Sequence, residues 1–502
     1  MSKKLIIFLI IFTLILSAGC QSQNSSTNDT IQQIKNEKED TKIDSSNEIK
    51  YKVQNNGGTF SSKDTIYFIM TDRFYDGNKE NNSFPDVNKN NPKAYHGGDL
   101  RGIIEKLDYI KSLGVTAIWI TPVFKNEYGG YHGYWITDFY KVDPHLGTLN
   151  DLKELVQEAH KRDIKIILDY VVNHTGYKSP WLKDEKYKDW FHPKKNISNW
   201  KDQKQLEEGW IFGLPDLNQD NPEVKKYFID NAIWWIEQTG IDGMRLDTVK
   251  HVPKSFWNEF AYKIKSKYPN FFLLGEVWHD NPRYLEQYHE VGIDSLTNYP
   301  LYMGLRKTFT RFGKANSLVN AIKRQSAFTN PELNGIFVDN HDNRRLVTEA
   351  KEYGEAYLKQ ALTFIMTYPG IPIIYYGTEI AMQGGDDPDN RRDMEWDKTD
   401  NSEMLSYFKK LTALRNSNEA LYNGEFELLD YDSYFLSYIR KKGDSKFIII
   451  YNLQTKEKDV NVNLKDNNST YTNVLNNKTY HSENGSLNIT LKPLEVIILT
   501  SN

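Results

Sequence analysis

Polar residues follow four apolar runs of the sequence, at the points where these runs end. The four endings read DYVVNH (169–174), GMRLDTVKH (243–251), GEVW (275–278) and VDNHD (338–342). A carboxylate after a strand is often only a helix cap, so one such ending alone says little. Together the endings bring carboxylates, histidines and a guanidinium, which are residue types of acid–base and nucleophilic catalysis. The series therefore indicates one catalytic face built from several loops.

Alternating strand and helix patterns must position these endings. Apolar, β-rich runs predict seven strands and a further strand around 292–296; the seven are Thr65–Thr71, Val115–Thr121, Lys165–Tyr170, Ile241–Asp247, Asn270–Glu276, Gly335–Asp339 and Ile371–Tyr376. Several are continuous apolar runs, as expected for parallel strands covered on both faces. Repeated βα units at this count favour an α/β fold, a (β/α)8 TIM barrel, over a doubly wound sheet. In such a barrel the loops after the carboxyl ends of the strands carry the chemistry.

Helical patterns separate the strands and define the domain limits. Two clear cases span 100–113 and 151–161, and a third helix is predicted to start at Pro222 and to end at Gly240. The barrel is predicted over 59–414, with a long polar insert rich in Trp and Lys at 174–212 after the third strand. Short alternating strands in 415–502 predict a separate antiparallel β-sandwich.

Composition excludes several classes of protein. The 502 residues are 39% hydrophobic and 26% charged, which is enough apolar material for a sizeable core. Lys and Arg number 63 and Asp and Glu 67, and this net charge of -4 does not point to a nucleic-acid partner. One cysteine, Cys20, excludes a disulfide framework and a multi-thiolate metal site. We expect a monomer.

The amino terminus carries an export pattern. Two lysines precede an apolar stretch at 5–16 that is too short for a comfortable spanning helix. Small residues then precede Cys20, and this string resembles the lipobox of bacterial lipoproteins, apart from Ser17 where a Leu is usual. The resemblance implies removal of a signal peptide (1–19), acylation of Cys20 and anchoring at the outer face of the bacterial membrane; an ordinary secretory signal with extracellular release is the alternative. Residues 20–58 are polar and predict a flexible tether.

The four endings resemble the signature regions of the α-amylase family of glycoside hydrolases, family 13. The strings YHGYW (131–135) and LPDLN (214–218) support the resemblance, which covers roughly 64–500. It implies retaining hydrolysis, for which two carboxyl groups must flank the scissile bond about 5–5.5 Å apart. Asp247 matches the nucleophile, Glu276 the general acid/base, and Asp342 a third carboxylate that grips the sugar.

The same resemblance implies a set of substrate-binding residues, which are Tyr134, His132, His174, Arg245, Lys250, His251, His341 and Arg345. Tyr134 matches an aromatic platform under the sugar. Arg245 lies two residues before Asp247, so both side chains face the same way on an extended strand and the cation is expected to lower the pKa of Asp247. Asp169 matches a residue that supports Arg245. Arg344 is the alternative to Arg345, whose spacing matches the family better.

The resemblance also implies calcium, which takes six to eight oxygen ligands. One expected site pins the insert to the barrel through Asn173, Asp216 and the carbonyl of His251, with a further carbonyl near 207. A second expected site resembles a calcium loop of cyclodextrin glucanotransferases; its ligands are Asp76, Asn78, Asn81, Asn82, Asp99 and the carbonyl of Gly97. A plain Asn- and Gly-rich turn is the alternative for the second cluster.

The strings also bear on the substrate, an α-glucan. Lys250-His251 and LPDLN favour endo-hydrolysis of α-1,4-glucosidic bonds in starch, glycogen and maltooligosaccharides, as in α-amylases. GEVWHD (275–280) and NRRDMEW (390–396) are closer to cyclomaltodextrinases and neopullulanases, which are the alternative. A glucan-binding lipoprotein without catalysis is a third hypothesis, and the presence of all three carboxylates argues against it.

Overall fold

The computed structural model describes residues 49–310, 313–464 and 469–501. The predicted signal peptide, the predicted lipidation site Cys20 and the predicted tether up to residue 48 lie outside the described residues. Within the described ranges, no helix has the length and apolar composition that crossing a bilayer requires.

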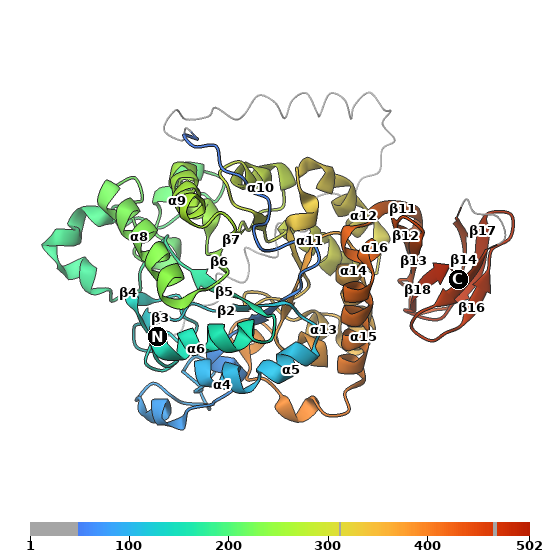
Figure 1. Ribbon diagram of the computed structural model, residues 1–502, viewed down its shortest axis with the longest axis horizontal. Coiled ribbons are helices and arrows are strands. Elements are labelled where there is room, and N and C mark those ends of the chain that lie inside the picture. Colours follow the sequence, from blue (N-terminus) through green and yellow to red (C-terminus); the bar gives the residue numbers. More distant parts are fainter. Residues whose placement is uncertain (1–48, 311–312, 465–468, 502) are drawn as a thin grey trace. The chain divides into compact units, whose positions relative to one another are not determined.

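Eight parallel strands form the centre of the fold (Figure 1). Their order in the sheet is β8-β7-β6-β5-β2-β1-β10-β9, and a parallel bridge between Thr297 and Gly335 joins the two ends. The strands are β1 (Ile66–Ile69), β2 (Ala117–Ile120), β5 (Lys165–Tyr170), β6 (Gly243–Leu246), β7 (Phe272–Gly275), β8 (Ser295–Leu296), β9 (Gly335–Phe337) and β10 (Ile371–Tyr375). The predicted (β/α)8 barrel is therefore confirmed, with each strand inside the range expected from the sequence.

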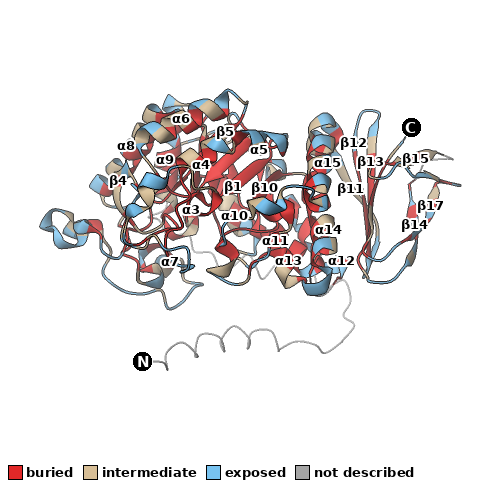
Figure 2. Cartoon of the chain, turned by 90° about the horizontal axis from the view of Figure 1, so that it is seen from below, coloured by how far each residue is buried: buried red, intermediate tan, exposed pale blue. Residues whose placement is uncertain are grey.

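Burial explains why these segments form strands. Almost every strand residue is buried, so the barrel strands are red in Figure 2, whereas the outer faces of the helices are pale blue. A strand covered on both faces needs no polar positions, which is why the runs read as continuously apolar.

Helices cover the outside of the barrel. The longer ones are α4 (Leu100–Glu105), α5 (Leu107–Ser112), α6 (Leu149–His160), α8 (Pro222–Thr239), α9 (Lys254–Lys267), α10 (Pro282–His289), α11 (Tyr299–Thr308), α12 (Ala315–Arg324), α14 (Gly354–Thr367) and α15 (Glu403–Ser417). Helix α8 starts at Pro222 with Asn221 as its cap, and Gly240 ends it in the left-handed conformation, as predicted. The predicted helix 100–113 is two helices, α4 and α5, which meet at Lys106.

Shorter elements lie in the loops at the catalytic end. A hairpin of β3 (Phe124–Asn126) and β4 (Ile136–Val142) follows β2. The insert after β5 contains η2 (Pro180–Lys183), η3 (Glu185–Trp190), α7 (Gln203–Glu208) and η4 (Ile211–Gly213). The remaining short helices of the barrel include α3 (Thr71–Phe74), η1 (Lys79–Ser83), η5 (Val249–His251), α13 (Leu346–Glu349) and η9 (Thr378–Ile380).

The carboxyl-terminal part is built from antiparallel strands. A six-stranded sheet has the order β11-β12-β13-β18-β15-β16, and β14 pairs with β17 in a second sheet. The strands are β11 (Glu425–Asp432), β12 (Phe435–Lys442), β13 (Ser445–Asn452), β14 (Lys458–Asn463), β15 (Thr470–Asn473), β16 (Thr479–His481), β17 (Ser486–Leu491) and β18 (Val496–Ser501). The sequence places the start of this part at 415, and its first strand follows at Glu425, after the end of α15 and the short helix α16 (Glu419–Asn423).

Residues 51–58, which the sequence assigned to the flexible tether, pack on the barrel instead. The Tyr51 backbone N–H donates to Asn258 Oδ1 at 2.7 Å, and Asn258 Nδ2 donates back to the Tyr51 carbonyl at 2.8 Å. The Tyr51 ring stacks on Tyr262 at 4.1 Å, and the Gly57 N–H donates to Asp294. The packed body thus begins near residue 51 rather than 59, because a few specific contacts hold a segment of polar composition.

Candidate active site

Arg245 joins three carboxylates at the carboxyl ends of neighbouring strands. It projects from β6, and its Nη1 lies 2.6 Å from Asp247 Oδ1 and 2.9 Å from Asp169 Oδ1, while Nη2 lies 2.9 Å from Glu276 Oε1. Asp169 belongs to β5 and Glu276 follows β7. All four side chains are buried, so their charges interact in a medium of low dielectric. The structure therefore brings the predicted nucleophile and the predicted acid/base onto one cation.

Burial changes the ionisation of this cluster. It raises the pKa of Asp247 well above its ordinary value; the Arg245 guanidinium opposes this rise, and the charge of Glu276 adds to it. It also raises the pKa of Asp169 to about 6, although Arg245, Tyr134 and Trp119 all stabilise the charged form. Arg245 therefore lowers the pKa of Asp247, as expected, but desolvation and the neighbouring carboxylates outweigh this single cation.

The chain around Thr248 connects the nucleophile to Glu276. Thr248 has φ 47° and ψ 40°, a left-handed conformation that a β-branched residue adopts only under strain. This turn directs the Thr248 N–H to Glu276 Oε2 at 3.1 Å and the Val249 N–H to the Glu276 carbonyl at 3.0 Å. Glu276 is thus held from the nucleophile's own loop as well as from β7.

Arg391 holds Asp342, the third predicted carboxylate. Its Nη2 lies 3.2 Å from Asp342 Oδ1, its Nε donates to the His341 carbonyl at 2.8 Å, and its Nη1 donates to Tyr131. Asp342 is half-buried, whereas Arg391 is buried and comes from the loop after β10. Sequence reasoning missed Arg391; the only signal was the NRRDMEW string, which the motif alone did not tie to Asp342.

Aromatic rings and histidines form the wall beside the carboxylates. Tyr134 stacks on His341 at 5.4 Å, lies parallel to His132, and donates its hydroxyl to Asp169 at 2.9 Å. His174 Nε2 faces the Tyr134 carbonyl at 3.2 Å. Burial lowers the pKa of His132 and His341 and that of His174 to about 4, so these rings are neutral hydrogen-bonding groups near pH 7. These four of the eight predicted substrate-binding residues therefore lie together beside Asp169 and Asp342.

Lys250 and His251 lie on the side of Glu276. Lys250 Nζ donates to the Trp278 carbonyl at 2.9 Å, and the Trp278 ring stacks on Tyr299, whose hydroxyl faces Glu276 Oε1 at 3.4 Å. The rings of His251 and of Trp200, which belongs to the insert, lie nearly perpendicular, with their centroids 6.1 Å apart. Trp200 and Trp278 are exposed, as is Phe212 at 74% of its surface. The mouth of the site therefore presents several aromatic faces to solvent.

Arg345, in contrast, lies away from the cleft. It is fully buried, and its guanidinium packs over the rings of Tyr375 and Tyr376 at 4.4 and 5.2 Å. A predicted substrate contact through Arg345 is not compatible with this position. Its neighbour Arg344 is exposed and pairs with Asp386.

Unpartnered oxygen atoms mark the first expected calcium site. Asn173 Oδ1 and Asp216 Oδ1 are buried without a hydrogen-bond partner among the described residues. His174 and Asp216 form a β-bridge, which places the start and the end of the insert side by side. His251 lies in η5, and its Nδ1 faces the Leu206 carbonyl at 3.0 Å, so the region near 207 also reaches this point. The donor set fits a hard cation.

The second expected site fits in part. Asn81 Oδ1 and Asn82 Oδ1 are buried and unpartnered within the described ranges, and a Cβ on Gly97 would lie 2.2 Å from Asn82 Oδ1. Asp99, however, caps α4 and accepts N–H groups from 77, 78 and 102. The side chain of Asn78 likewise accepts the backbone N–H of Glu80.

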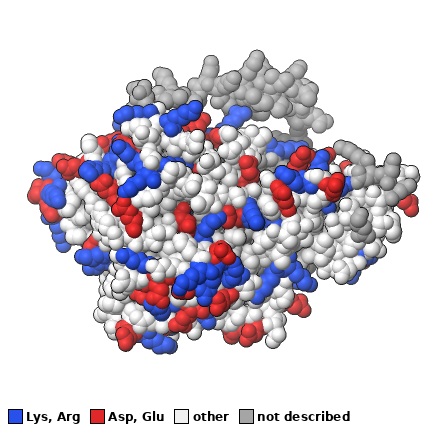
Figure 3. Space-filling view, viewed as in Figure 1, with Lys and Arg blue, Asp and Glu red and all other residues white. Residues whose placement is uncertain are grey.

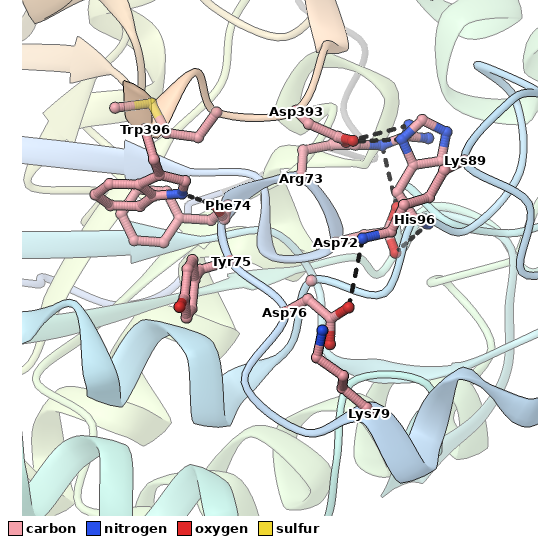
Figure 4. A pocket seen from close by; sticks show the side chains of 12 residues that line it. Asp72, Arg73, Phe74, Tyr75, Asp76, Lys79, Lys89, His96, Asp393 and Trp396 are labelled. Carbon is pink, nitrogen blue, oxygen red and sulfur yellow. Dashed lines mark hydrogen bonds and ion pairs between the residues drawn. The ribbon is translucent and has the colours of Figure 1, made fainter. Parts of the chain in front are cut away.

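A cavity of about 280 Å³ adjoins this second cluster (Figure 4). Asp76 and Lys79 lie on one side, and Arg73, His96 and Asp393 lie on the other. His96 Nδ1 contacts Asp393 at 2.7 Å, which ties the loop after β1 to the loop after β10. On the face drawn in Figure 3, basic and acidic side chains are interspersed.

Comparisons with known proteins agree with this geometry. Residues 68–410 match the family model described as the α-amylase catalytic domain, and residues 426–498 match that of the maltogenic amylase C-terminal domain. An α-amylase structure from Anoxybacillus is 49% identical, with a TM-score of 0.84, over 88% of this chain and 98% of that one.

Two curated relatives carry other names. A beta/alpha-amylase of Paenibacillus polymyxa is 40% identical over 88% of this chain, although the chain spans only 38% of that relative's length. A cyclomaltodextrinase of Thermoanaerobacter pseudethanolicus is 34% identical over 79% of this chain and 71% of the relative. With two thirds of the chain matched to the catalytic-domain model and the three carboxylates placed at the carboxyl ends of the barrel strands, the chain belongs to the α-amylase family, family 13 of the glycoside hydrolases.

Proposed function

We propose that this glycoside hydrolase cleaves α-1,4-glucosidic bonds of cyclodextrins and short maltooligosaccharides, in the manner of cyclomaltodextrinases, maltogenic amylases and neopullulanases. The observation that carries the chemistry is the placement of Asp247 and Glu276 on the two Nη atoms of Arg245. The cyclomaltodextrinase relative and the maltogenic C-terminal domain support the substrate class.

The reaction proceeds with retention in two steps. Asp247 attacks the anomeric carbon while Glu276 gives its proton to the glycosidic oxygen. The glycosidic bond breaks, and a glycosyl ester forms on Asp247. Glu276 then takes a proton from water, whose oxygen attacks the same carbon and releases the Asp247 carboxylate. Arg245 stabilises the carboxylate charges in both steps, and Asp342 holds sugar hydroxyls from the other side.

A second candidate is endo-hydrolysis of starch and glycogen, as in α-amylases. The 49% identity to the Anoxybacillus α-amylase favours it. Exposed Trp200, Phe212 and Trp278 offer stacking faces for either substrate.

Product analysis separates these candidates. The purified protein is incubated with soluble starch, pullulan and β-cyclodextrin, and initial rates of reducing-sugar release are compared. Faster cleavage of β-cyclodextrin than of starch supports the proposal, whereas rapid starch cleavage without cyclodextrin cleavage supports the α-amylase. Asp247→Asn is the control, with a loss of kcat of at least about 1,000-fold. Equal rates for this variant and wild type would instead indicate a non-catalytic glucan-binding protein.

We also propose two calcium sites, with Asn173, Asp216 and the His251 carbonyl at the first and Asp76, Asn81, Asn82 and the Gly97 carbonyl at the second. Calcium would supply positive charge that pins the insert and the loop after β1 to the barrel. Thermal unfolding with EDTA and with added CaCl2 tests this. A calcium-dependent rise in Tm that Asn173→Leu and Asn82→Leu each reduce supports both sites, and a Tm independent of calcium rejects them.

We propose, finally, that Cys20 anchors the protein to the outer face of the bacterial membrane. Mass spectrometry of the amino-terminal peptide tests this, with Cys20→Ser as the control. A diacylglyceryl-modified Cys20 supports the anchor, and cleavage at another residue indicates simple secretion.

A further inference from the structure

A groove of about 230 Å³ lies beside the loop that follows β7, the strand before Glu276. One wall is the loop after β7, and the other walls are the helices α11 and α12. The polar lining comes from all three elements and consists of Asp280, Lys307, Ser317, Asn320 and Arg324.

Two of the elements that form the groove also lie beside Glu276. Trp278 precedes Asp280 by two residues in the same loop, and its ring stacks on Tyr299 at 4.9 Å with the planes 10° apart. Tyr299 is the first residue of α11, which goes on to line the groove through Pro300 and Met303. The loop and the helix that flank Glu276 therefore also form the walls of the groove.

Close packing of α11 on α12 shapes this groove. A Cβ on Gly304 would lie 2.6 Å from the Cβ of Ala321, so only glycine lets the two helices approach this closely. Met303 and Pro300 provide apolar surface, while Asp280 can accept and Asn320 and Arg324 can donate hydrogen bonds. Apolar surface between convergent donors and acceptors matches a sugar ring, which carries hydroxyl groups at its edge and C–H groups on its faces.

We propose that this groove binds a glucosyl unit of a linear α-1,4-glucan beyond the unit that stacks on Trp278. The inference rests on the proposed glycosidase function and adds a binding site that extends it to longer chains. A linear chain can continue past Trp278 into the groove, whereas a cyclodextrin ring turns back toward the cleft and a trisaccharide ends before it.

Chain-length dependence of kcat/KM tests the groove. The double variant Asp280→Ala/Asn320→Ala removes hydrogen-bonding groups from two walls, and Ser317→Trp fills the space. Asn316→Ala is the matched control, because Asn316 is also an exposed Asn of α12 but does not line the groove. The substrates are maltotriose, maltoheptaose and β-cyclodextrin.

We expect kcat/KM for maltoheptaose to fall about 3- to 10-fold in both groove variants, through a higher KM, because each lost sugar hydrogen bond contributes a modest free energy. For maltotriose and β-cyclodextrin the change should stay below about two-fold. Equal losses of kcat/KM on all three substrates, or no loss on maltoheptaose, would overturn the proposal that the groove binds a glucosyl unit. Absence of hydrolysis of any glucan by wild type would overturn the proposed function instead, which separates the two failures.

Discussion

Arg391 holds Asp342 through Nη2, while its Nε and Nη1 fix the planar guanidinium on the His341 carbonyl and the Tyr131 hydroxyl. Lysine keeps the charge but cannot reproduce this fork. We expect Arg391→Lys to lower kcat/KM on maltooligosaccharides about 100-fold, because a small shift of a positioned group is costly in catalysis. Steady-state kinetics measure this loss, and thermal unfolding should show little change in Tm.

The adjacent Arg392 provides the control for this prediction. It is exposed and pairs with Asp389, away from Asp342. Arg392→Lys should keep kcat/KM within about two-fold. Similar losses in both variants would mean that the loop as a whole, rather than the fork of Arg391, determines activity.

His145 makes stability depend on pH. Burial lowers its pKa, but Asp143 at 2.7 Å and Asp86 at 2.9 Å outweigh burial and raise it, while Tyr95 stacks on the ring at 3.8 Å. A raised folded-state pKa means that the stabilisation is fully present below the unfolded value of about 6.5 and is lost as pH rises through the folded value.

Urea unfolding of His145→Gln across pH 5.5–9 measures this effect. The variant should lose about 2 kcal/mol relative to wild type at pH 5.5, as expected for hydrogen bonds to charged groups, and the difference should shrink at higher pH. His481→Gln, on exposed β16, should follow wild type at every pH. A difference that grows with pH would show that His145 acts as a neutral ring.

At this scale the sequence was informative where a side chain directly follows a strand. The places of Asp247 and Glu276 could be predicted because each directly follows a strand, and that of Asp342 because its motif lies in the loop after β9. Arg391 and Arg345 could not, since one reaches Asp342 from another loop and the other turns into the interior. Both depend on how loops pack, which spacing along the chain does not encode.

The turn from β6 into η5 stores strain beside the nucleophile. Thr248 occupies the left-handed region, and its Oγ1 is buried without a partner among the described residues. Asn tolerates this conformation better, so Thr248→Asn should raise the free energy of unfolding by about 1 kcal/mol. Chemical denaturation measures the gain. Thr248→Val, which keeps the branched Cβ, should show none; an equal gain there would assign the effect to the hydroxyl group.

Elements differ in how well their sequence predicted them. Strand β5 matches its predicted range because it contains the apolar run 166–168 and every residue after Lys165 is buried. Strand β11 gives no clear strand signal, because its residues are exposed or half-buried without alternation. The two-residue β8 is too short for any period, and only its place in the series indicated it.

One face of the six-stranded sheet joins the hydrophobic core of the barrel, whereas its other face packs with β14 and β17 in a second core. Tyr438 of β12, Tyr451 of β13 and Ile498 of β18 belong to the same buried cluster as the barrel residues. Arg440 donates to the Thr367 carbonyl at 2.7 Å and Gln360 to the Asn452 carbonyl at 2.7 Å, across the same boundary. The predicted sandwich therefore has a core of its own and is also joined to the barrel by buried contacts.

Scanning calorimetry tests this continuity. We expect one cooperative transition for the body of the protein, and Tyr438→Ala should lower its Tm as a unit, with a loss of about 3–5 kcal/mol typical of large buried rings. The exposed Tyr434→Ala should leave the transition in place. Two resolved transitions, of which Tyr438→Ala moves only one, would contradict a shared core.

Closure of the barrel between β8 and β9 has a dynamic consequence. Among the described residues, three contacts join these strands: the Thr297–Gly335 bridge, the Asn298 N–H donating to the Gly335 carbonyl at 2.8 Å, and the Leu296 N–H donating to Asn334 Oδ1 at 3.0 Å. Strands β1 and β2, in comparison, share four register pairs. Local opening of the barrel should begin between β8 and β9, and amide hydrogen exchange should be faster there than in the other barrel strands. Because β8 pairs with β7, the strand before Glu276, and β9 leads to Asp342, we expect such opening to change the distance between these two carboxylates.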